Sequence, residues 1–257
     1  MLNLPERSEP RRAAFEPAGA AAAYRVVGAL ARRLHVEVAG LEHVPSGRAL
    51  IVANHAFGWD VLFAMSAVWH DKRRIAWALG DHVFWKVPFV GRIATTFGTV
   101  DGTPENVDRL LARDELVVVQ PGGVREAVKP RELRYRLLWG DRYGFIRAAI
   151  RNQAPIVPLA CVGADDLFDL VGNAYERGGR WLKRDDIPLP LPAWFFPFPR
   201  RVKLRYVFGE TIFPRVSREH EHDADVVREM RRHVEGALHE LLEGELIKRA
   251  GISTRSK

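Results

Sequence analysis

Short apolar runs alternate with helix-like segments along most of this chain, and this alternation constrains the fold more than any other feature. Residues 49–53, 116–120 and 156–162 have the length and apolar character of buried strands. Residues 59–69 and 146–150 have helical spacing. The repeated strand–helix order predicts an α/β fold, with a mostly parallel central sheet flanked by helices and ligand sites at the strand ends.

Local signals predict further elements. Thr103 followed by proline is typical of a helix start, because Thr is a good N-cap and Pro fits the first helical position. Residues 95–100 resemble another short strand, and residues 202–208 alternate as a strand with one basic, half-solvated face. Apolar side chains at helical spacing behind an Asp cap predict a long helix over residues 223–249.

The 257 residues indicate one domain with a flanking segment at each end. Residues 1–17 are charged and contain prolines, so we predict a flexible extension there and a frayed tail at residues 251–257. Residues 18–250 then form the single domain, which opens with an amphipathic helix that lies on the protein or on lipid headgroups. The one cysteine, Cys161, stands in an apolar run and is predicted to be a buried structural thiol.

A net charge of +7 and a pI near 9.8 indicate attraction to polyanions, or simply a solvated basic surface. No zinc-ligand spacing, RNA motif or long basic helix is evident, so we expect no metal site and no nucleic-acid partner. No apolar stretch reaches the roughly 20 residues that span a bilayer. The charged start is not typical of a signal peptide, so we expect a cytoplasmic protein.

A polar Asn-His pair follows the first apolar run directly. Asn54 and His55 stand at its end, and Asp60 comes five residues after the histidine. On a continuous helix His55 and Asp60 would point about 140° apart, so they meet only across a bend, which Gly58 can supply. Asp60 could then accept a proton from one imidazole nitrogen while the other nitrogen deprotonates a hydroxyl. Taken alone, the pair also fits a turn histidine and a helix-start aspartate.

Further blocks surround this pair in a fixed order. They are Gly40 to Pro45, Pro88-Phe89-Val90-Gly91 with Gly98-Thr99-Val100-Asp101, Gln120-Pro121-Gly122-Gly123-Val124-Arg125-Glu126, and Ala154 to Leu159. With Asn54, His55 and Asp60, they resemble the glycerolipid (1-acylglycerol-phosphate type) acyltransferase family over roughly residues 36–165.

The resemblance implies transfer of a fatty acyl group from acyl-CoA or an acyl-carrier protein to a glycerolipid hydroxyl. Together with the basic charge, it leads us to expect a peripheral protein on the anionic inner face of a membrane. The resemblance also implies His55 as general base, Asp60 as its orienting partner, and no cofactor beyond acyl-CoA as co-substrate. The implied substrate-binding residues are Asn54, Gly98, Asp101, Pro121, Gly122, Gly123, Arg125 and Glu126. The amides of Gly122 and Gly123 offer sites for an oxyanion or phosphate, although Pro-Gly-Gly is also an ordinary tight turn.

Two departures from the family pattern bear on the acceptor. Members acting on phosphorylated glycerol usually carry Arg where this chain has Gly102 and Glu where it has Gly122, whereas Arg125 is kept. Loss of one guanidinium removes a bidentate phosphate contact. The Pro-Gly-Gly-x-Arg-Glu form resembles the branch associated with neutral acylglycerol acceptors.

Other functions fit the same residues. A non-catalytic lipid-binding protein on this scaffold would use its basic surface, and a (thio)esterase would use water as acceptor. The aromatic, proline-broken residues 189–201 fit either insertion at the headgroup boundary or a loop that covers the core. Residues 139–143 fit either an acyl groove or, more commonly, scaffold packing.

Overall fold

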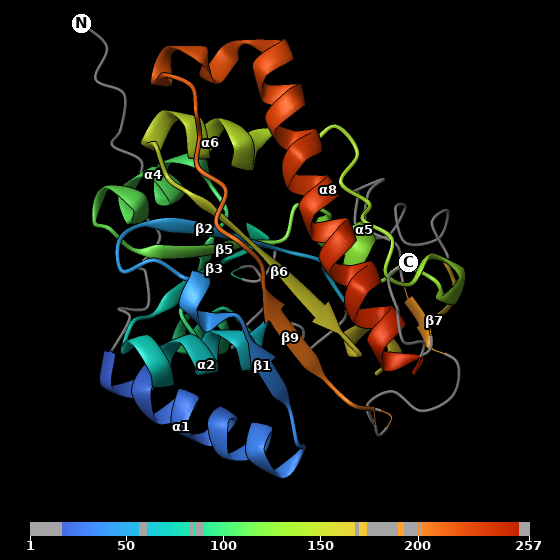
Figure 1. Ribbon diagram of the computed structural model, residues 1–257. Coiled ribbons are helices and arrows are strands. Elements are labelled where there is room, and N and C mark those ends of the chain that lie inside the picture. The colour runs from blue at the N-terminus through green and yellow to red at the C-terminus, as the bar shows by residue number, and fades with distance from the viewer. Residues whose placement is uncertain are drawn as a thin grey trace, which may run out of the picture.

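A seven-stranded sheet forms the centre of the molecule (Figure 1). The computed structural model describes residues 17–56, 61–82, 85, 90–167, 170–173, 190–192, 200 and 202–251. The strand order is β1-β9-β6-β2-β5-β3-β4. These strands are β1 (Glu37–Ala39), β2 (Ala49–Ala53), β3 (Ala76–Gly80), β4 (Thr99–Asp101), β5 (Leu116–Val119), β6 (Ile156–Val162) and β9 (Arg205–Phe208). A separate antiparallel pair consists of β7 (Leu170–Asn173) and β8 (Pro190–Pro192).

The sheet is mostly parallel, as the strand–helix order predicts. β6, β2, β5, β3 and β4 run in the same direction. β9 is antiparallel to β6, and β1 is parallel to β9. The carboxyl ends of β2, β5 and β6 therefore meet at one edge of the sheet, where a ligand site is expected in such folds.

Helices cover both faces of the sheet (Figure 1). α1 and α2 lie on one face, and α4, α6 and α8 lie on the other. The helices are α1 (Pro17–Arg33), α2 (Leu62–Lys72), α3 (Val90–Thr96), α4 (Pro104–Ala112), α5 (Gly123–Ala127), α6 (Gly144–Asn152) and α8 (Ala224–Arg249). Short 3-10 turns are η1 (Leu41–His43), η3 (Arg131–Leu133), η4 (Ala164–Asp166) and η5 (Arg218–His222).

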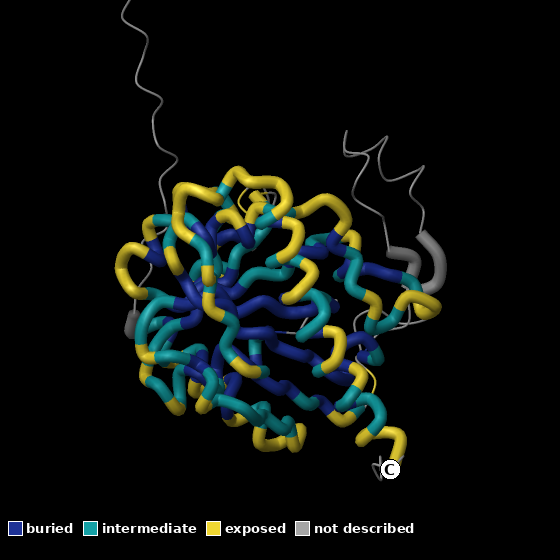
Figure 2. The backbone as a smooth tube through the Cα atoms, turned by 45° about the horizontal axis from the view of Figure 1, so that its top comes forward, coloured by how far each residue is buried: buried dark blue, intermediate teal, exposed yellow. Residues whose placement is uncertain are grey.

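The central strands are buried on both faces, as the dark blue centre of Figure 2 shows. Successive side chains of β2 alternate between two apolar clusters: Ile51 packs toward α1 and α2, whereas Leu50 and Val52 pack toward α4, α6 and α8. Such two-sided burial explains why β2 is a continuous apolar run. Cys161, on β6, is fully buried, as predicted.

Two helix starts follow from single capping residues. The Thr103 side chain accepts the backbone N–H of Asn106 at the start of α4, with Pro at the first position. The Asp223 carboxylate accepts the N–H groups of Asp225 and Val226 at the start of α8. Both predicted caps are confirmed.

Two strand predictions need correction. Residues 95–100 are not one strand, because α3 continues to Thr96 and β4 begins only at Thr99. Gly98, with φ +74°, makes the turn between them. The predicted strand over residues 202–208 is shorter, since β9 begins at Arg205, whose guanidinium binds Glu37 and Glu245.

Several predictions fall on residues outside the described ranges. These are nearly all of the N-terminal extension, the bend with Asp60, the tail after Gly251, and most of the aromatic segment 189–201. Of residues 139–143, Trp139 is buried in the core and contacts Phe145 edge-on, which is the packing role.

α1 is attached to the sheet through α2 and α3. Ser66 of α2 donates a hydrogen bond to the Tyr24 carbonyl, and the buried Tyr24 hydroxyl donates to the Phe97 carbonyl just after α3. α1 therefore lies on the protein along one side. No helix in the described ranges has both the length and the apolar character needed to cross a membrane.

Candidate active site

Asn54 ties the carboxyl end of β2 to β6. Its side chain is fully buried, its Nδ2 donates to the Cys161 carbonyl at 3.1 Å, and its Oδ1 accepts the Cys161 N–H at 2.7 Å. The amide thus continues the pairing of β2 with β6 beyond its last backbone pair, Ala53 with Leu159. Asn54 holds the chain in register one residue before His55.

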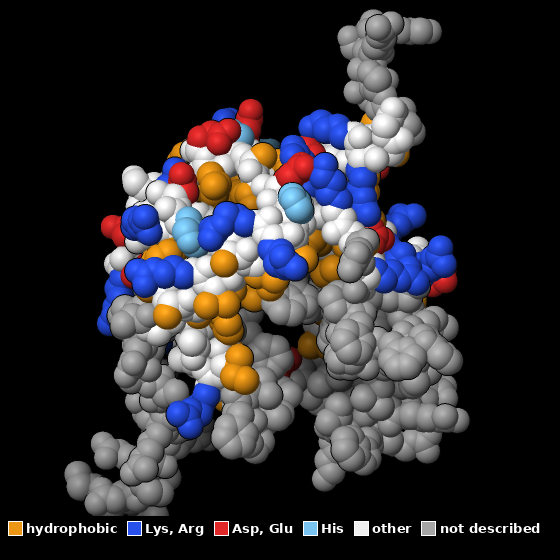
Figure 3. Space-filling model, turned by 90° about the horizontal axis from the view of Figure 1, so that it is seen from below, with side chains coloured by type: hydrophobic (Ala, Val, Ile, Leu, Met, Phe, Trp, Pro, Cys, Tyr) orange, Lys and Arg blue, Asp and Glu red, His pale blue; other side chains and the backbone are white. Residues whose placement is uncertain are grey.

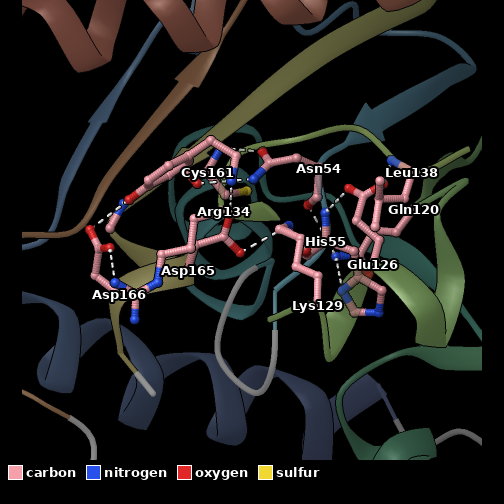
Figure 4. A network of polar contacts seen from close by, with 12 residues as sticks. Asn54, His55, Gln120, Glu126, Lys129, Arg134, Leu138, Cys161, Asp165 and Asp166 are labelled. Atoms are coloured by element: carbon pink, nitrogen blue, oxygen red, sulfur yellow. Dashed lines mark hydrogen bonds and ion pairs between the residues drawn. The ribbon is translucent and has the colours of Figure 1, made fainter. Parts of the chain in front are cut away.

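His55 lies half-buried at the carboxyl edge of the sheet (Figure 4). Its Nδ1 lies 2.9 Å from Nε2 of Gln120, the residue that follows β5. Its backbone N–H donates to Glu126 Oε1 at 2.7 Å, and its carbonyl accepts from Lys129 Nζ at 2.7 Å. The ring and both polar groups of the backbone are therefore in contact with the segment that follows β5.

Glu126 is enclosed behind His55 rather than open to solvent. Its side chain has no exposed surface, and its second oxygen accepts the Leu138 N–H at 2.7 Å. Burial raises the pKa of this carboxyl, while Lys129 and the two amide donors act in the opposite direction. Glu126 thus has a place in the site, but as a support for the backbone and not as an exposed substrate contact.

Gly122 leaves the space that Glu126 occupies. A Cβ built at Gly122 would overlap both the carboxylate and the Cβ of Glu126. A side chain at position 122, including the Glu of the phosphate-directed pattern, is therefore incompatible with this placement of Glu126. The enclosed position of the Glu126 carboxylate therefore requires glycine at position 122.

The Pro-Gly-Gly turn is held by its own chain and by Arg142. The Gly123 N–H donates to the Gln120 carbonyl at 3.0 Å, so this amide already has an acceptor. Arg142 Nη1 donates to the carbonyls of Pro121, at 3.0 Å, and Gly122. The turn therefore presents a guanidinium beside the site, in addition to its glycine backbone.

Lys129 and Asp165 form a buried ion pair beside the backbone of His55 (Figure 4). Their N–O distance is 3.0 Å, and their side chains are only 2% and 3% exposed. The other Asp165 oxygen accepts the Tyr135 N–H at 2.6 Å. Burial raises the pKa of Asp165, and Lys129 opposes that change.

The remaining predicted residues are spread along the sheet. Arg125 is exposed on α5, close in sequence to the histidine contacts. Asp101 ends β4, an outermost strand of the sheet. It lies at the carboxyl ends of the strands, as His55 does, but three strands away from β2. Gly98 precedes β4 and so lies at the amino ends of these strands, away from His55, where it faces Ile75 and Tyr24. Asp60 is outside the described residues.

Gln120, Lys129, Arg142 and Asp165 were not among the predicted site residues. Gln120 had a usable signal, because it is the polar residue directly after an apolar run, as Asn54 is after β2. Lys129 had none, since its partners His55 and Asp165 are distant in sequence. Within the described part of the chain, no group of three or more His, Cys, Asp or Glu side chains is placed to hold a metal ion.

The sequence is similar to those of several known proteins. The chain is 32% identical over 177 residues to a mouse protein named "DGAT1/2-independent enzyme synthesizing storage lipids", covering 68% of this chain and 52% of that one. It is 36% identical over 189 residues to an uncharacterized protein of Mycobacterium tuberculosis, covering 69% and 52%. It thus spans about half the length of these curated relatives.

A solved structure and a family model complete the comparison. The 1-acyl-sn-glycerophosphate (LPA) acyltransferase PlsC of Thermotoga maritima matches with a TM-score of 0.48 and 18% identity, covering 83% of this chain and 79% of that one. The family model named Acyltransferase matches residues 35–162, which contain β1 to β6 and the residues that contact His55. The resemblance of the sequence blocks is confirmed, and this chain belongs to the acyltransferase family.

Proposed function

We propose that this chain transfers a fatty acyl group from acyl-CoA or an acyl-carrier protein to a lipid hydroxyl, with His55 as the general base. The proposal rests on the position of the His55 imidazole, which lies half-buried at the carboxyl ends of the parallel strands. The backbone N–H and the carbonyl of His55 are both hydrogen-bonded, so its backbone is fixed. Family membership supports acyl transfer. A fixed backbone is what a base needs, because its efficiency depends on being within hydrogen-bond reach of the proton it removes.

The proposed reaction needs no metal or resident cofactor. The acceptor oxygen attacks the thioester carbonyl carbon while the His55 imidazole takes the hydroxyl proton. The carbon–sulfur bond then breaks, and the imidazolium returns the proton to the departing sulfur. Asp60 is proposed to accept the N–H of one imidazole nitrogen, while the other nitrogen takes the hydroxyl proton. The Gln120 side-chain amide, whose Nε2 lies 2.9 Å from Nδ1, lies beside the ring on the β5 side.

The substrate is proposed to lie along the carboxyl edge of the sheet. Arg125 and Arg142 offer exposed guanidinium groups beside the Pro121–Gly122–Gly123 turn, where an anionic part of the donor would be stabilised. Gly102 and Gly122 favour a neutral acylglycerol acceptor over a phosphorylated one. The printed name of the mouse relative, an enzyme synthesizing storage lipids, is consistent with that preference.

The face formed by α1 and α3 is proposed to lie on an anionic membrane surface, such as the inner face of the cytoplasmic membrane. Val26 on α1 is 69% exposed and Ile93 on α3 is 60% exposed. Figure 3, which shows the molecule from the side below α1 and α2 in Figure 1, shows hydrophobic side chains among Lys and Arg side chains. Arg32 and Arg33 close α1. Apolar side chains within a basic surface suit anionic headgroups.

The test compares His55→Ala with His239→Ala, an exposed histidine of α8 as matched control. Purified protein is supplied with long-chain acyl-CoA and a panel of acylglycerol and lysophospholipid acceptors, thiol release is followed, and products are identified by mass spectrometry. His55→Ala should fold normally and lose roughly 10²- to 10⁴-fold in turnover, the usual range for a lost general base. Unchanged turnover in folded His55→Ala removes the mechanism, and free fatty acid as the sole product identifies water as the acceptor.

A further inference from the structure

The backbone of His55 is held between two buried groups of opposite charge (Figure 4). The Glu126 carboxylate accepts its N–H, and the Lys129 ammonium donates to its carbonyl, both at 2.7 Å. Both groups come from α5 and the two residues that follow it. A rotation of the peptide planes on either side of His55 would break at least one of these charge-assisted bonds.

We propose that Lys129 is a positioning residue, whose bond to the His55 carbonyl fixes the direction in which the imidazole leaves the backbone. This assignment rests on the proposed role of His55 as general base. Lys129 itself is 5% exposed, so its ammonium acts on the substrate only through the histidine. Lys129 is therefore not itself a catalytic residue.

The ion pair with Asp165 does not by itself explain why a lysine is present here. Burying two charges costs desolvation free energy, and a buried ion pair can often be replaced by apolar residues without loss of stability. The Lys129–Asp165 pair is therefore weak as a stabilising device. The bond from Lys129 Nζ to the His55 carbonyl, in contrast, fixes the orientation of the His55 backbone. Asp165 then serves as the counter-ion that keeps the ammonium charged in the interior.

The position of Lys129 is itself fixed from two directions. Asp165 lies in η4, directly after β6, and it also accepts the Tyr135 N–H. Glu126, one helical turn before Lys129, bonds the Leu138 N–H. The ends of β2 and β6 and the loop after α5 thus converge on the backbone of His55, which is what preorganisation of a base requires.

The experiment compares the single variant Asp165→Asn with the double variant that combines Lys129→Met and Asp165→Asn. Both carry the same neutral amide at position 165. They differ in the donor to the His55 carbonyl and in the buried charge of Lys129, which Asp165→Asn leaves without its counter-ion. Because of that charge, Asp165→Asn should have the lower thermal unfolding midpoint, and kcat is compared at a temperature where both variants are folded. The double variant should show about 10- to 100-fold lower kcat than Asp165→Asn, with KM within about twofold, because a displacement of about 1 Å at a catalytic group can cost 10²-fold.

Equal kcat in the two variants overturns the proposal, since Lys129 would then be only a partner of Asp165. A rise in KM with unchanged kcat also overturns it, because that result places Lys129 in substrate binding. Should the double variant not fold, Asp165→Asn decides: kcat within about threefold of wild type supports the carbonyl bond as the element that matters, and a large loss assigns the effect to the ion pair. Loss of the proposed function is seen separately, as a wild type without acyl transfer or a fully active His55→Ala.

Discussion

Replacing Gly122 with alanine tests whether the space at this glycine serves Glu126. Gly122 has φ −65° and ψ −22°, an ordinary right-handed conformation, so alanine costs no backbone strain there. The new Cβ would overlap the Glu126 carboxylate and Cβ. The carboxylate must therefore leave, and the N–H groups of His55 and Leu138 lose their acceptor.

The expected loss follows from these two amides. Each buried donor left without an acceptor costs about 1–3 kcal/mol, so Gly122→Ala should lower the free energy of unfolding by about 2–6 kcal/mol. Alanine regains about 0.5–1 kcal/mol by restricting the unfolded chain. A net loss of several kcal/mol is a large share of the roughly 5–15 kcal/mol that stabilises a typical domain. Turnover should fall as well, because His55 loses one of the two bonds that fix its backbone.

The assay is urea unfolding followed by tryptophan fluorescence, with kcat measured on the same preparations. Gly47→Ala is the matched control, because a Cβ at Gly47 meets nothing within 4 Å and its φ is not positive. This control should stay within about 0.5 kcal/mol of wild type. If Gly122→Ala unfolds at the same urea concentration as Gly47→Ala and keeps its kcat, the steric coupling of Gly122 to Glu126 is refuted.

Two further predictions concern pH and the membrane. Burial raises the pKa of Glu126 in the folded protein above its value of about 4.3 in the unfolded chain. Between these two pKa values the folded state binds the proton and the unfolded state does not, so the free energy of unfolding falls as the pH rises through this range. Glu126→Gln cannot titrate, so its stability relative to wild type in urea unfolding should increase as the pH rises above about 4.3, and a relative decrease would contradict the raised pKa. Charge reversal of Arg32 and Arg33 to Glu should reduce binding to phosphatidylglycerol-containing vesicles at least about tenfold, at about 1 kcal/mol for each charge near the surface. Arg232→Glu, on exposed α8, is its control, and equal binding by both contradicts the proposed face.

The fold was predictable where one local rule decides a segment. β2 and β6 are buried on both faces, so their sequences are continuous apolar runs with clear limits. The starts of α4 and α8 depend on the side chains of Thr103 and Asp223, which bond amides two or three residues away. The error at residues 95–100 has the same origin, because a left-handed glycine at 98 separates a helix from a three-residue strand inside one short stretch.

The candidate active site was only partly predictable, because the bonds that support His55 join residues far apart in sequence. The Asn-His pair is visible at the end of an apolar run, and so is the turn after β5. Glu126 and Lys129 bond the backbone of His55 from 71 and 74 residues away, and these bonds depend on β2 and β5 being neighbours in the sheet. Without the pairing of β2 with β5, the sequence explains Glu126, next to Arg125, equally well as a substrate-binding residue.

The pairing of Gly122 with Glu126 changes what the departure at position 122 means. Viewed in the sequence, the missing Glu at 122 is the loss of a substrate-directed group. Viewed in the structure, glycine is required there because the carboxylate that holds the His55 N–H comes from four residues later and passes through the space of a Cβ. In this chain, a side chain at position 122 would therefore require another group to hold the backbone N–H of His55. The proposed preference for a neutral acceptor and the support of the proposed base would then depend on the same residue, Gly122.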